Sequence, residues 1–355
     1  MANFINIYSS ITAYNADETK EYPNVSYLET EDEVKWQATE PIDQEYVVAK
    51  YNVVDTSSAT KVLNNTNNIT KMIVDGVEQP SVTTGYTFSS TGIHKVKYKP
   101  NSSWNGVNAF RGCSGLTSAT FPDNIASIGG DIFRDCVSLT KIVIGSGVTS
   151  IGNNAFSGCT SLPTVVIPDS VTSIGEGVFY RCSGLTSVSI GSGVTSIGVS
   201  AFGRCSGLAS IVIPDSVTDI QYNTFNNCSG LTSVSIGSGV TSIGQSAFQS
   251  CTALTSINIP SGVASIGGAV FDACRSLATV SIGSGITEIG GSSFSNCNSL
   301  ASVTVEATTP PTLGSNVFRN NASGRKIYVP SASVNAYKTA NNWSTYAYDI
   351  MAIPS

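Results

Sequence analysis

The 355-residue chain has little charge and a single histidine. Only 12% of its residues are charged, about half the share typical of soluble globular proteins, and its 18 Lys plus Arg are outnumbered by 24 Asp plus Glu. Because a nucleic-acid-binding protein needs a basic stripe, no nucleic-acid partner is expected. No run of about 18 apolar residues occurs either, so no membrane span is expected. The 41% hydrophobic content nevertheless suffices for a core, which excludes wholesale disorder.

What the sequence has is a 23-residue repeat. In the repeat at 185–207, Leu185, Val188 and Ile190 have the spacing of a short strand with one buried face, and Gly198 is predicted to adopt a positive φ. Such a unit cannot bury its own apolar side, so the units are expected to stack into a solenoid. Side chains would then repeat in register, which disfavours charge because stacked like charges repel.

A longer period of 46 residues lies over the 23. The residue that ends the first strand of each repeat alternates between proline and glycine. These eight residues are Pro122, Gly145, Pro168, Gly191, Pro214, Gly237, Pro260 and Gly283.

Nine cysteines mark the repeat, each with a Phe three residues before it and a Leu three residues after it. They are Cys113, Cys136, Cys159, Cys182, Cys205, Cys228, Cys251, Cys274 and Cys297. No C-x-x-C occurs and the spacing matches no zinc signature, so no metal is expected. Stacked in register, the thiols point the same way, which favours a buried ladder of free cysteines as structural core residues. Scattered disulfides are the alternative.

The segment IPDSVTSIGEGVFYRC at 167–182 resembles the BspA-like, or Treponema-type, class of bacterial leucine-rich repeat proteins. The resemblance covers residues 105–308 and implies a mostly β leucine-rich-repeat solenoid; Gln221 departs from it where the other repeats have Gly. The tail resembles the capping end of members from gut Bacteroidetes. This implies an edge strand at Lys326–Val329, a short helix near 333–340, and Trp343 and Tyr346 covering the last coil.

Four regions are predicted. Residues 1–50 hold ten acidic and three basic residues, a net charge of −7, without clear periodicity. Strand-like runs at 46–54, 70–74, 77–79, 84–88 and 93–98, with a hairpin signal at Asp75-Gly76, indicate a small immunoglobulin-like sandwich. The regions are an acidic N-terminal arm at 1–44, the β-sandwich at 45–100, the solenoid at 101–308 and a C-terminal cap at 309–355.

No catalytic motif accompanies this scaffold, so neither an enzyme nor a cofactor is predicted. The sequence has no G-x-S-x-G, H-E-x-x-H or P-loop motif. His94 has no predicted nucleophile or base beside it and is interpreted as a surface residue of a strand. Asp215 and Asp219 are close enough in sequence to suggest a glycosidase pair, but solenoid corners offer no evident cleft.

The positions that flank each repeat's Phe vary, whereas the apolar positions hardly change. Arginine and tyrosine are frequent in binding hot spots, so these variable positions form a candidate recognition surface. Its residues are Arg134, Tyr180, Arg181, Arg204, Tyr222 and Gln249. Two alternatives stay open: these positions are simply unconstrained by packing, or recognition uses a sheet face lined by Ser and Thr.

The predicted function is that of a non-enzymatic binding or adhesion protein outside the bacterial cell, with a protein or glycan on a host or bacterial surface as partner. Repeat solenoids offer extended binding surfaces, and this inference rests on family analogy. The alternative is a phage tail fibre or receptor-binding virion protein docked through its N-terminal arm, suggested by the lack of a signal peptide at Met1. Residues 1–44 are in either case the candidate segment for assembly or oligomerisation.

Overall fold

The computed structural model describes residues 25–30, 33–38 and 43–354, which fall into two units divided after Asp43. In the first unit, β1 (Val25–Thr30) pairs antiparallel with β2 (Glu33–Ala38). The rest of the predicted acidic arm lies outside the described residues. Its role in docking or assembly therefore stays a prediction.

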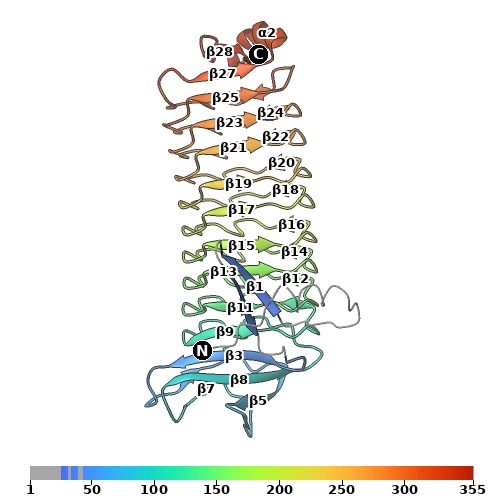
Figure 1. Ribbon diagram of the computed structural model, residues 1–355, viewed down its shortest axis with the longest axis vertical. Helices are drawn as coiled ribbons and strands as arrows, with labels where there is room; N and C mark the ends of the chain where they lie inside the picture. Colours follow the sequence, from blue (N-terminus) through green and yellow to red (C-terminus); the bar gives the residue numbers. More distant parts are fainter. Residues whose placement is uncertain (1–24, 31–32, 39–42, 355) are drawn as a thin grey trace. The chain divides into compact units, whose positions relative to one another are not determined.

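In the second unit each 23-residue repeat forms one coil, and the coils stack through parallel strands (Figure 1). Each strand pairs with the residues 23 positions away, as Val165 does with Val188. On one side lie β9 (Leu116–Thr120), β11 (Lys141–Val143), β13 (Thr164–Ile167), β15 (Ser187–Ile190), β17 (Ser210–Val212), β19 (Ser233–Ser235), β21 (Ser256–Ile259), β23 (Thr279–Ile282), β25 (Ser302–Val305), β27 (Lys326–Val329) and β28 (Ile350–Ala352).

The second side of the coils is one continuous sheet of nine very short parallel strands. These are β10 (Ser127–Ile128), β12 (Ser150–Ile151), β14 (Ser173–Ile174), β16 (Ser196–Ile197), β18 (Asp219–Ile220), β20 (Ser242–Ile243), β22 (Ser265–Ile266), β24 (Glu288–Ile289) and β26 (Thr312–Leu313). The third side consists of the turns that carry Phe and Cys. These turns are also linked from coil to coil, as where the Phe156 N–H donates to the Val178 carbonyl. The mostly β solenoid predicted from the repeat is thus confirmed.

The core is a stack of phenylalanine rings. Neighbouring rings from Phe110 to Phe318 lie 5.2–5.7 Å apart between centroids, with planes within 16° of parallel. Because Phe318 stacks on Phe294 and β26 pairs with β24, the solenoid runs one coil beyond the predicted limit at residue 308.

All nine cysteines are buried and unpaired. The thiol of Cys159, like those of the seven that follow it and of Cys136, donates to the Phe carbonyl of the preceding coil at 3.0–3.3 Å. Burial raises the pKa of Cys228 to about 12, which keeps the thiol protonated. In the last coil Asn321 takes the cysteine's place, and its Nδ2 donates to the Phe294 carbonyl at 2.8 Å.

The prediction that Gly198 has a positive φ is wrong. Glycine is needed there for space, since a Cβ on Gly198 would lie 2.6 Å from the backbone of Gly175 in the coil before. The left-handed conformation falls instead two and six residues later, at Ser200 and Arg204. At Gln221, which replaces this glycine, the pairing of β16 with β18 shrinks to the single pair Ile197–Ile220.

The alternation of proline and glycine has a structural cause. The Asp169 carboxylate after Pro168 accepts hydrogen bonds from the Ser192 backbone N–H (2.7 Å) and hydroxyl (3.0 Å) in the next coil. A Cβ on Gly191, above Pro168, would lie 2.6 Å from the proline's backbone. A proline corner therefore requires a glycine corner above it. The same carboxylate bonds recur at Asp123 and Asp215.

The N-terminal β segment contains β3 (Val47–Val53), β4 (Thr60–Lys61), β5 (Ile69–Val74), β6 (Val77–Glu78), β7 (Gly85–Tyr86) and β8 (Gly92–Pro100). It is β, as predicted, but its main sheet does not end at residue 100. Strand β3 pairs antiparallel with β9 of the first coil, which gives one sheet in the order β11-β9-β3-β8-β5-β6. The segment thus covers the first coil and shares its core, so the predicted separate sandwich is corrected to a cap continuous with the solenoid. The Tyr98 ring, for example, packs edge-on against Phe110 at 5.4 Å.

His94 on β8 is buried rather than on the surface, with 8% of its area exposed. Its Nδ1 lies 2.6 Å from the Asp75 carboxylate and its Nε2 lies 2.8 Å from the Ser90 carbonyl. Sequence spacing gave no sign of this, because Asp75 reaches His94 only through the turn between β5 and β6. With an acceptor at each nitrogen, the imidazole is better matched when protonated. The hydrogen bond to Asp75 and that to Ser90 raise the pKa of His94 against the opposing effect of burial.

This geometry predicts a stability that depends on pH. Because the folded pKa lies above the unfolded value, the contribution of His94 is complete below about pH 6.5 and is lost as pH rises through the folded pKa. We expect the free energy of unfolding, measured in urea, to fall between pH 6 and pH 8. In the His94→Gln variant this fall should disappear, and an unchanged slope would contradict the assignment.

The C-terminal cap forms as the tail sequence predicts. After β27 come the 3₁₀ turn η1 (Ser331–Ser333), α2 (Val334–Thr339) and η2 (Trp343–Tyr346). Trp343 is buried with its Nε1 donating to the Pro311 carbonyl, and Tyr346 packs edge-on against Phe318 at 5.3 Å. None of the helices among the described residues has the length and hydrophobicity of a bilayer span.

Candidate recognition site

Four consecutive coils share a polar hollow of about 320 Å³ on the turn side of the solenoid. It lies beside the stacked phenylalanines, at the positions that flank Phe156, Phe179, Phe202 and Phe225. Its lining residues are Asn154, Glu176, Gly177, Tyr180, Ser200, Gly203, Arg204, Asn223 and Asn226.

The hollow exists because two coils lack a side chain where their neighbours have one. Gly177 occupies the position held by Asn154 in the coil before and by Ser200 in the coil after. Gly203 likewise lies between Tyr180 and Asn226. Gly177 also has a φ of +59°, which the residues at the equivalent positions share. Two glycines therefore form the floor, and the longer side chains form the rim.

Tyr180, Arg181 and Arg204, which the sequence singled out, come together here. The Arg181 guanidinium lies 5.3 Å and the Arg204 guanidinium 6.0 Å from the centroid of the Tyr180 ring. Both are cation–π distances, which holds two positive charges beside one half-buried ring. Among the described residues no carboxylate lies within ion-pair distance of either arginine.

The other three candidates do not line the hollow. Arg134 is held by Asp131 at 3.0 Å, and its Nε lies 3.7 Å from Asp135. Tyr222 is 47% exposed but belongs to a different column of the turns. Gln249 donates to Asp272 at 3.0 Å and accepts from Asn226 at 3.1 Å. It is thus one member of a ladder of side-chain hydrogen bonds that continues from coil to coil.

Sequence reasoning missed the amides of the site. The side chains of Asn154, Ser200 and Asn223 form no hydrogen bond within the part of the chain that the structure describes. Each has a left-handed backbone, at φ 55°, 55° and 57°. They belong to the variable positions before Phe, but asparagine there is also explained by its tolerance of this conformation. The sequence signal for them was therefore ambiguous.

The Ser/Thr sheet face offers less. Its threonines direct their hydroxyls to the carbonyl of the coil before, as Thr172 does to Thr149 at 3.1 Å and Thr195 does to Thr172 at 3.2 Å. These hydroxyl protons are already donated within the protein. Val166 and Val212, exposed at 67% and 65%, interrupt the polar character of the neighbouring strand side.

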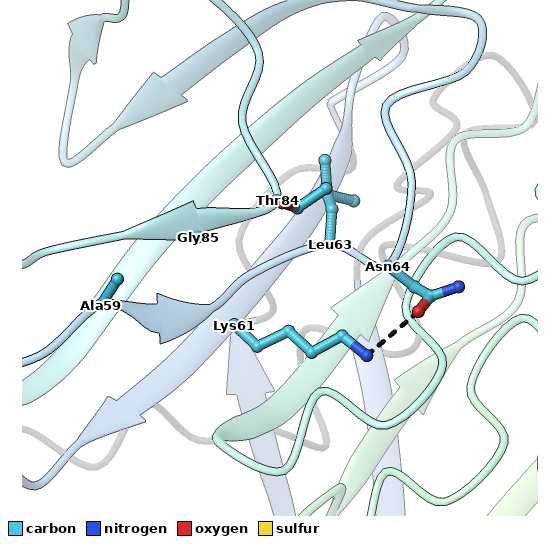
Figure 2. A pocket seen from close by; sticks show the side chains of 6 residues that line it. All are labelled: Ala59, Lys61, Leu63, Asn64, Thr84 and Gly85. Atoms are coloured by element: carbon cyan, nitrogen blue, oxygen red, sulfur yellow. Dashed lines mark hydrogen bonds between the residues drawn. The ribbon is translucent and has the colours of Figure 1, made fainter.

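A second hollow, of about 290 Å³, lies in the N-terminal cap beside β4 and β7 (Figure 2). Lys61 is its only charged lining residue. Its ammonium donates to Asn64 at 3.1 Å and to the Arg111 carbonyl at 2.7 Å, which ties the cap to the first coil. The lysine thus has a structural task. No group of three or more His, Cys, Asp or Glu placed to hold a metal occurs among the described residues.

A family model of the BspA-type leucine-rich repeat region matches residues 103–232 and 223–345, in six copies. The chain belongs to the BspA-type leucine-rich repeat family. A family member's repeats thus include all nine cysteines and the whole polar hollow. No curated protein matches the chain significantly.

Solved structures show the same fold. A leucine-rich repeat protein from Bacteroides ovatus is 21% identical with a TM-score of 0.51, over 88% of this BspA-type chain and 86% of its own. The leucine-rich repeat protein of T. pallidum is 21% identical with a TM-score of 0.39, over 68% and 92%. A leucine-rich cell surface protein from Faecalibacterium prausnitzii is 24% identical with a TM-score of 0.25, over 55% and 82%.

Proposed function

We propose that this BspA-type protein is a non-enzymatic binding protein outside the bacterial cell, and that the polar hollow is its recognition site. The observation that supports this most is the pair of unpaired guanidiniums beside three unbonded polar side chains in one hollow. Unsatisfied donors at a surface depression are suited to an external ligand. The location outside the cell, and adhesion to a host or bacterial surface, follow from the family resemblance.

The alternative as a virion component gains no support of its own. It was suggested by the acidic N-terminal arm, most of which lies outside the described residues. The hollow serves recognition in either setting.

Filling the hollow tests the proposal. Gly177→Asn places a side chain on its floor, and the backbone accepts it because Asn154 and Asn223 have the same left-handed conformation at this position. We expect the full chain to bind on an array of glycans and extracellular-matrix proteins, and the variant to lose that binding while keeping its Tm within about 3 °C.

Ala269→Asn is the matched control. Ala269 has a φ of 55° at the same position of a coil outside the hollow, so this variant should bind as the unmodified protein does. Binding that survives Gly177→Asn would place recognition elsewhere on the solenoid. Absence of any binding above background would contradict the function itself.

A further inference from the structure

We propose that the hollow binds an acidic polysaccharide, with Arg181 and Arg204 holding the carboxylate or sulfate of one sugar and the neighbouring amides holding its hydroxyls. This proposal rests on the function proposed above and specifies the class of ligand.

The charge of the hollow favours an isolated anionic group. Arg181 and Arg204 lie against one tyrosine ring and have no carboxylate partner among the described residues. A guanidinium presents its N–H groups in a planar fork that matches carboxylate and sulfate oxygens. Glu176 on the same rim leaves a local charge of about +1, counting two arginines against one carboxylate. A densely charged polyanion would meet repulsion from Glu176, whereas a sugar with one acidic group would not.

The backbone gives a second, independent indication. Arg181 and Arg204 have φ values of 62° and 63°, in the left-handed region. At the same position other coils use residues that suit this conformation better or are small, such as Gly158, Asn227 and Ser250. An arginine has no short polar group to stabilise this conformation locally. Two consecutive arginines at a position that disfavours them are best explained by what their side chains do.

The rest of the hollow matches hydroxyl groups. Asn154 and Asn223 supply an amide donor and acceptor each, Ser200 supplies a hydroxyl, and Glu176 is an acceptor. A sugar ring presents several hydroxyls that donate and accept at once. An acidic peptide would use the arginines but leave most of these groups without partners, which carries a desolvation cost. The glycan is therefore the better match.

The experiment compares the full chain with the double variant Arg181→Asn, Arg204→Asn. Asparagine tolerates the left-handed backbone, so Tm should be unchanged or higher, and loss of binding cannot be due to unfolding. Binding to a uronic-acid polysaccharide and to a sulfated polysaccharide is measured by calorimetry, each beside its carboxyl-reduced or desulfated neutral form. We expect the acidic form of one of them to bind at least about tenfold more tightly than its neutral form, and the variant to lose this difference.

Arg319→Asn serves as the control for net charge, since it removes a cation in the last coil far from the hollow in sequence; its binding should match that of the unmodified chain. The carboxyl-reduced and desulfated arms identify which acidic group is recognised. Equal binding of acidic and neutral forms, tighter binding of an acidic peptide such as polyglutamate, or unchanged binding by the double variant would each overturn the proposal. If Gly177→Asn still abolishes binding of a neutral glycan or a protein in those cases, the proposed function stands without it. If nothing binds, both fail.

Discussion

Replacing Phe225 by alanine is expected to lower the free energy of unfolding by about 3–5 kcal/mol. The ring is fully buried in the middle of the stack, 5.3 Å from Phe202 and 5.2 Å from Phe248, with planes within 7° of both. Truncation leaves a void between two rings that are held by their own coils and cannot close on each other. The Cys251 thiol, which donates to the Phe225 carbonyl, lies at the same place. The loss should be measured from the denaturant midpoint and slope.

Tyr222→Ala in the same coil is the control for Phe225→Ala. Its ring is 47% exposed, so its loss should change the free energy of unfolding by no more than about 0.5 kcal/mol. A loss below about 1 kcal/mol in Phe225→Ala would mean that the stack closes over the void and that the rings do not hold the coils apart.

Gly193→Ala should destabilise the solenoid by about 3 kcal/mol, near the upper end of what overpacking does, because its added Cβ would meet backbone. That Cβ would lie 1.9 Å from the Asp169 carbonyl oxygen, so one coil must move away from the other. The displacement would also disturb the hydrogen bonds from Ser192 to the Asp169 carboxylate. Chemical denaturation measures the loss, and hydrogen exchange locates it at the corner between these coils.

Ser170→Ala is the matched control, because Ser170 holds the same position one coil earlier. It already has a Cβ there, and the substitution removes only the hydroxyl bond to the Val148 carbonyl. A loss of about 1 kcal/mol is expected. Equal effects of the two alanines would show that glycine at this corner is not required by the space.

The stacking of the coils could be predicted from the sequence because a repeat reports its own geometry. Leu185, Val188 and Phe179 recur in register, and an apolar column in a repeat has no plausible place except a shared core. The same argument extended to the cysteines, which lie in that core as hydrogen-bonded thiols. The C-terminal cap was predicted from its resemblance to related tails.

The rest depended on contacts that spacing does not reveal. A glycine can serve a positive φ or a close approach, and at Gly198 the second reason applied. The pairing of β3 with β9 and the approach of Asp75 to His94 join segments that share no repeat. Of the recognition residues, Tyr180 and Arg204 could be found as variable and hot-spot types. The floor formed by Gly177 and Gly203 could not, because a missing side chain becomes a cavity only when its neighbours are placed.

The alternation of corners determines how a protein of this kind can change its length during evolution. Removing one glycine coil, for instance the coil of Gly191, would set Pro214 directly above Pro168, where a residue with a Cβ already meets the proline's backbone. Removing one proline coil would stack glycine on glycine and discard the carboxylate that holds the next serine. Removing or duplicating 46 residues leaves every such contact in place. The heritable unit of this solenoid is therefore a pair of coils, and natural variants in length should differ by even numbers of repeats.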